Sequence, residues 1–119
     1  MPNTKNFNLV HLIEAVGDGE DLIRMLEIFV DSTPKILNEL NNSHTDGNFD
    51  GIAASAHKLK ATIDILRIEE LQGVVREMDR LSSVQENQDK LPQFISKIND
   101  VMTQVLAEIK DTYLSDNKV

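Results

Sequence analysis

The chain has 119 residues, no cysteine and a formal net charge of −8. This length fits one domain with its own core, and the absence of cysteine excludes disulfide frameworks, thiolate metal sites and cysteine nucleophiles. The acidic balance repels nucleic-acid phosphates and anionic lipid, so we expect neither nucleic acid nor a membrane as a partner.

Apolar residues recur at helical spacing from the N-terminal part of the chain, and no strand pattern interrupts them. A short helix is predicted over about Leu9 to Val16, and Gly17-Asp18-Gly19 ends it, with Asp18 as the N-cap of the next helix. The apolar stripe of the second helix stays in phase across Pro34, which favours one kinked helix over two. The polar stretch Asn41 to Asp50 predicts a loop.

Three further apolar stripes follow in the second half of the chain. The third helix carries Ile52 to Leu66, the fourth Ile68 to Leu81, and the last Leu91 to Ile109, with Pro92 in its first turn. The residues after Leu114 are polar and are expected to fray.

Four long amphipathic helices must bury their apolar faces together. The predicted fold is therefore all-α: an antiparallel four-helix bundle with a short extra N-terminal helix. We expect a single domain over residues 1–119, with its core at about 9–114.

His57 is the one residue of the third helix that packing does not explain. On a wheel of about 100° per residue it points roughly 140° away from the core direction, so the imidazole should be exposed. Ala53 and Ala54 lie one turn before it, Lys60 and Ala61 lie one turn after it, and Asp64 lies two turns after it.

This arrangement suits phosphoryl transfer. A neutral imidazole attacks phosphorus without a separate strong base. The negative charge of the transferring group is stabilised by a nearby cation, a role that we assign to Lys60. Small neighbours leave room for a second protein, so Ala53, Ala54, Ala61 and Asp64 are predicted to form the partner-docking surface.

The same stretch, Ala56-His57-Lys58-Leu59-Lys60-Ala61-Thr62, resembles the signature of the histidine-containing phosphotransfer (HPt) family. Leu71, Val74, Val75, Met78 and Asp79 continue the match, and the resemblance covers about Leu9 to Leu106. Two residues depart from the family pattern: Ala61 stands where glycine is usual, and Arg67 stands where a second glycine is frequent, at the bend into the fourth helix.

The resemblance implies a phosphorelay intermediate with His57 as the phosphoacceptor and Lys60 as the lysine beside it. The partners would be response-regulator receiver domains, possibly of a hybrid sensor kinase, which supply the phosphoaspartate and a Mg²⁺ ion. The chain itself would need no cofactor and no metal. It would be a carrier and not an enzyme, and the absence of a glycine-rich phosphate loop predicts neither ATP binding nor autokinase activity.

Two alternatives remain open. A purely structural helical adaptor would bind a partner and transfer nothing, and such a protein would be expected to lack His57. The dimerisation and phosphoacceptor module of a histidine kinase also places a histidine on a helix, but there an acidic residue typically follows it, whereas Lys58 follows here. Because four helices in one chain satisfy one another, we expect a monomer. We also expect a cytoplasmic location, because the chain shows no apolar span and no signal core at its start.

Overall fold

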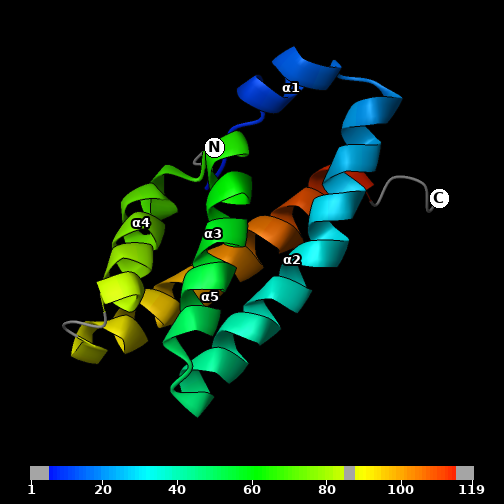
Figure 1. Ribbon diagram of the computed structural model, residues 1–119. Coiled ribbons are helices and arrows are strands. Elements are labelled where there is room, and N and C mark those ends of the chain that lie inside the picture. Colours follow the sequence, from blue (N-terminus) through cyan, green and yellow to red (C-terminus); the bar gives the residue numbers. More distant parts are fainter. Residues whose placement is uncertain (1–5, 85–87, 115–119) are drawn as a thin grey trace.

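The computed structural model describes residues 6–84 and 88–114, and over these residues the chain is helical with no strand (Figure 1). Its helices are α1 (Val10–Val16), α2 (Glu20–Asp46), α3 (Phe49–Ile65), α4 (Glu69–Val84) and α5 (Leu91–Ile109). A 3₁₀ turn, Gln88–Lys90, precedes α5, and a π-helical turn, Lys110–Leu114, follows it. The predicted fraying after Leu114 lies outside the described residues.

The four long helices form the predicted bundle. Each of them packs against the next in chain order, and α5 closes the ring against α2. In Figure 1, α3 stands between α2 and α4, and α5 crosses behind them. The short α1 makes its main helix contact with the N-terminal end of α2. The expectation of a short extra N-terminal helix is therefore confirmed.

The apolar stripes of the sequence meet in one core. Residues without exposed surface come from all four long helices: Leu26 and Leu40 of α2, Leu59 and Ile63 of α3, Leu71 and Met78 of α4, and Ile98 and Met102 of α5. Burial of each such side chain contributes about 1.5–3 kcal/mol. One face of α3 is fixed inward by this packing, which determines what its opposite face presents to solvent.

A reciprocal amide pair joins α2 to α5 beside this core. Asn99 Nδ2 donates to Asn41 Oδ1 at 2.9 Å, and Asn41 Nδ2 donates to Asn99 Oδ1 at 3.2 Å. Because each amide satisfies the other, sliding one helix past the other would leave partly buried polar groups unpaired.

Two local predictions are wrong. The loop expected over Asn41 to Asp50 is mostly helix, because α2 runs on to Asp46. The true connection is short: Gly47 ends α2 in the left-handed conformation (φ 68°), and the Asn48 side chain caps α3 by accepting from Gly51 N at 3.0 Å. The N-cap position of α2 belongs to Gly19 and not to Asp18, and no side chain bonds there.

The prediction that one helix continues across Pro34 is confirmed, since α2 contains Pro34 in its interior. Proline removes one backbone donor from the ladder, and the packing of α2 against α3 and α5 compensates for this loss.

Arg67 occupies the bend between α3 and α4 with a left-handed backbone, φ +50°. A residue with a Cβ pays about 1–2 kcal/mol for this conformation, whereas glycine adopts it freely. The frequent family glycine at this bend therefore has a direct conformational reason. Arg67 offsets the strain with side-chain contacts, because its Nη1 lies 2.8 Å from His11 Nε2 and its Nη2 donates to Glu69 at 3.0 Å.

We expect Arg67→Gly to be more stable than Arg67→Ala by about 1 kcal/mol, because both variants lose the guanidinium contacts but only alanine keeps the strain. Urea unfolding of the two variants gives the comparison. Equal midpoints would show that the bend stores no strain at this residue.

Candidate functional site

The candidate site lies midway along α3. Alanines on both sides of His57 favour the helix, and the Asn48 cap fixes its start. The side chain of His57 is 69% exposed, as its position on the helical wheel predicts. It is therefore a ring that a second protein can reach, and the core residues on the opposite face of α3 hold its backbone in place.

Two charged side chains meet beside the imidazole. Asp79 of α4 places its Oδ2 atom 3.7 Å from His57 Nε2 and 3.6 Å from Lys60 Nζ. Asp79 is 17% exposed and Lys60 is 28% exposed, so this ammonium–carboxylate pair is partly shielded from water and less screened than a surface pair. The distance to His57 exceeds that of a hydrogen bond.

Lys60 is therefore not a freely solvated surface lysine, although its position on the helical wheel would be compatible with one. Its amine is held on the histidine side of α3 by a carboxylate from the next helix. Positioning before a reaction matters, because a cation already in place costs no reorganisation when charge develops near it.

The predicted docking residues are distributed around this centre. Ala54 and Ala61 are exposed and Ala53 is partly exposed, so they leave a low surface on both sides of the ring. Asp64 is held by Arg76 of α4, whose Nη2 and Nη1 donate to its two carboxylate oxygens at 2.7 and 3.2 Å. These hydrogen bonds raise the pKa of the Arg76 guanidinium above its ordinary value.

Sequence reasoning included Asp79 in the family resemblance but assigned no role to it or to Arg76, which pair with Lys60 and Asp64. Asp79 lies at the border of the apolar stripe of α4, next to the buried Met78. A single acidic residue at the edge of a buried stripe is the signal that would have marked it. Its partner could not be identified without the packing of α3 against α4.

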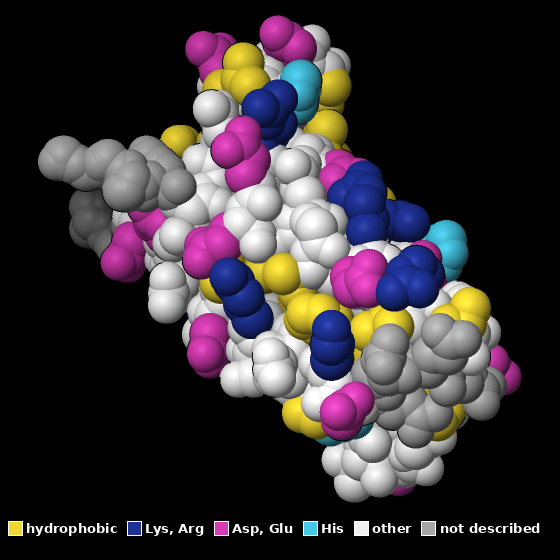
Figure 2. Space-filling model, turned by 90° about the vertical axis from the view of Figure 1, so that its left-hand side faces the viewer, with side chains coloured by type: hydrophobic (Ala, Val, Ile, Leu, Met, Phe, Trp, Pro, Cys, Tyr) yellow, Lys and Arg dark blue, Asp and Glu magenta, His cyan; other side chains and the backbone are white. Residues whose placement is uncertain are grey.

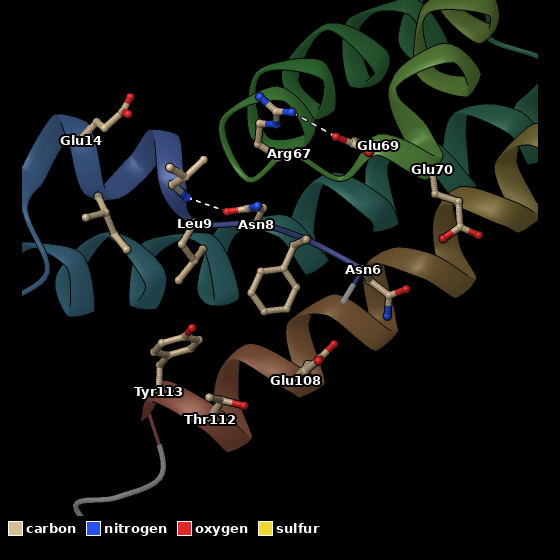
Figure 3. A pocket seen from close by; sticks show the side chains of 13 residues that line it. Asn6, Asn8, Leu9, Glu14, Arg67, Glu69, Glu70, Glu108, Thr112 and Tyr113 are labelled. Atoms are coloured by element: carbon tan, nitrogen blue, oxygen red, sulfur yellow. Dashed lines mark hydrogen bonds and ion pairs between the residues drawn. The ribbon is translucent and has the colours of Figure 1, made fainter. Parts of the chain in front are cut away.

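A hollow of the molecule lies away from this site. It measures about 880 Å³ and lies between the N-terminal segment, the start of α4 and the π-helical turn (Figure 3). Carboxylates of Glu14, Glu69, Glu70 and Glu108 surround it, and no histidine lines it. Because no histidine lines this hollow, we place the chemistry on the open α3–α4 surface, where His57 is exposed.

The described residues contain no group of three or more His, Asp or Glu side chains arranged to hold a metal ion. Among the same residues, no helix is both long and apolar enough to cross a membrane.

The bundle thus presents an exposed imidazole and a positioned ammonium group on a surface that a second protein can reach. A comparison with known protein families matches the Hpt domain to residues 24–110, which is most of the chain. The chain therefore belongs to the Hpt domain family. Hpt domains are phosphotransfer carriers of two-component signalling and not catalytic enzymes, and their partners are receiver domains. Comparisons with curated proteins and with solved structures gave no match.

Proposed function

We propose that this chain is a phosphorelay intermediate that accepts a phosphoryl group on His57 from the phosphoaspartate of one receiver and passes it to the aspartate of another. The observation that carries the proposal is the exposed imidazole, with Lys60 and His57 within 4 Å of the same Asp79 oxygen.

The phosphoryl group moves to His57 in a single displacement step. The lone pair of a neutral His57 ring nitrogen forms a bond to phosphorus while the bond from phosphorus to the aspartyl oxygen breaks. The electron pair of the broken bond leaves with the receiver's carboxylate, and the other ring nitrogen keeps its proton. The reverse displacement loads the next receiver.

Lys60 supports this step through its charge. The transferring group spreads negative charge over its equatorial oxygens, and a fixed cation nearby lowers the energy of that state. Asp79 is the positioning residue, because it holds the ammonium group beside the imidazole before a receiver arrives.

The receiver supplies the remaining catalytic groups. Mg²⁺ belongs to the receiver, and the chain needs no cofactor of its own. It does not bind ATP or phosphorylate itself, and we place it in the cytoplasm.

The test mixes the chain with a set of radiolabelled phosphorylated receivers. Appearance of label on this chain supports the proposal, and retention of label by every receiver contradicts it.

We expect the chain to sediment as a monomer across a wide concentration range, because α2 to α5 already cover one another's apolar faces. A kinase dimerisation module needs a second copy to complete its bundle. A stable dimer that persists on dilution would favour that alternative.

A further inference from the structure

Asp79 holds its carboxylate beside the imidazole on a short side chain. Its neighbour Met78 is fully buried, and α4 packs along α3 with its apolar stripe inward. Asp79 itself is 17% exposed. Because the packing of the two helices fixes the backbone of Asp79, its charge stays close to His57 whether or not the ring carries a phosphoryl group.

The free chain and the phosphorylated chain place this carboxylate in different electrostatic surroundings. In the free chain, Asp79 Oδ2 lies 3.7 Å from His57 Nε2 and 3.6 Å from Lys60 Nζ, and neither contact is repulsive. A phosphoryl group bound to that ring nitrogen brings negatively charged oxygens next to Oδ2. Like charges this close repel each other, and the partial burial of Asp79 reduces the screening by salt and water.

Lys60 is the cation that would offset this repulsion, but it is shared. Its ammonium group already contacts Asp79, so after transfer one cation faces two anionic groups. The other lysine beside His57 in the sequence, Lys58, pairs with Glu39 at 3.1 Å. Figure 2 shows a similar mixture on the face where α4 lies, with basic side chains among acidic ones. The described surface around the ring therefore offers a phosphorylated His57 little excess positive charge.

We propose that Asp79 raises the free energy of phosphorylated His57 relative to the free chain, and so directs the phosphoryl group onward to a receiver. The inference rests on the proposed function, since it concerns the regulation of the same site. In the discharge step the bond from nitrogen to phosphorus breaks and its electron pair stays on the ring, while a carboxylate oxygen of the receiver forms the new bond to phosphorus. This step separates the phosphoryl group from the Asp79 carboxylate. The chain then passes phosphoryl groups on and does not store them.

This role of Asp79 differs from the positioning of Lys60. A group that only lowers the barrier speeds loading and discharge by the same factor, and it leaves the equilibrium between chain and receiver unchanged. Repulsion in the phosphorylated chain acts on one end state, so it changes that equilibrium. The equilibrium ratio is therefore a readout that a purely positioning role would not move.

The test measures the ratio of label on the chain to label on one receiver at equilibrium. The mixture is started once from phosphorylated receiver and once from phosphorylated chain, and both must reach the same ratio. We expect Asp79→Asn to shift the equilibrium constant toward the phosphorylated chain by about 10-fold, because the repulsion between like charges in a partly shielded site is removed. Asp79→Ala, a second neutral variant, should shift it in the same direction.

Two controls separate the charge of Asp79 from other effects. Asp79→Glu keeps the negative charge and should keep a ratio close to that of the wild type. Asp100→Asn makes the same chemical change at an exposed residue of α5, which lies behind α3 in Figure 1, and should leave the ratio unchanged. Circular dichroism checks that all variants are folded.

The outcomes distinguish this inference from the proposed function. A wild-type ratio in both neutral variants would overturn the inference, whereas label on the wild-type chain would still support the phosphorelay role. An equal shift in Asp79→Glu and Asp79→Asn would also overturn it, because the charge would then not be the cause. Acceptance of label by His57→Gln, or retention of label by every receiver mixed with the wild-type chain, would overturn the proposed function and the inference with it.

Discussion

His57→Gln should abolish phosphoryl acceptance and leave the fold intact. Glutamine keeps a polar side chain of similar length but has no nitrogen lone pair suited to attack on phosphorus. The imidazole is mostly exposed and makes no core contact, so the free energy of unfolding should change by less than about 0.5 kcal/mol. Label transferred from a phosphorylated receiver measures acceptance, and urea unfolding measures stability.

His44→Gln provides the control for this prediction. His44 lies near the end of α2, a different part of the surface from the α3–α4 seam, and its replacement should leave acceptance at the wild-type level. Loss of acceptance in both variants would point to a general effect of the substitution. If His57→Gln still accepted label, the phosphoacceptor would have to be another residue.

The helices and the direction of His57 were predictable because they depend on spacing within one helix. The stripe from Ile52 to Leu66 fixes the buried side of α3, and the outward direction of the histidine follows from it. The length of α2 was not predictable, because Asn and Ser near its end disfavour a helix locally while tertiary packing stabilises it.

The charges around His57 were only half predictable. Lys60 and Asp64 share the helix of His57, so their side of the surface follows from the sequence. Their partners, Asp79 and Arg76, come from α4, and their identity depends on how far that helix is shifted along α3. A single sequence contains no direct signal for this shift. The ion pair with Arg76 holds the Asp64 carboxylate in one position, which the wheel did not show.

The bend at Arg67 illustrates a different limit. Arginine carries no sequence signal for a left-handed backbone, and nothing in the spacing around it indicates φ +50°. Only the departure from the family glycine drew attention to this position. In the structure, the backbone of Arg67 is strained, and its side chain contacts His11 and Glu69.

Lys60→Ala should slow phosphoryl transfer at saturating receiver by about 10-fold or more, which corresponds to about 1.4 kcal/mol of transition-state stabilisation. In the free chain the ammonium group is neutralised by Asp79 and partly hydrated. When a receiver docks and excludes water, the same charge acts in a lower dielectric on the developing phosphoryl charge. Receiver affinity should change much less than the transfer rate, because the stabilised charge is greatest in the transition state. Rapid-quench measurement over a range of receiver concentrations separates the two quantities.

Lys58→Ala is the matched control for this prediction. Lys58 lies next to His57 in the sequence, but its amine pairs with Glu39 of α2 at 3.1 Å, on the side of α3 away from Asp79. Removing this charge lowers the net charge by the same amount without emptying the site beside the imidazole. A similar slowing in both variants would mean that only the overall charge of the surface matters. Unchanged transfer by Lys60→Ala at saturating receiver would reduce Lys60 to a structural partner of Asp79, and the stabilisation of the transferring group would then have to come from the receiver alone.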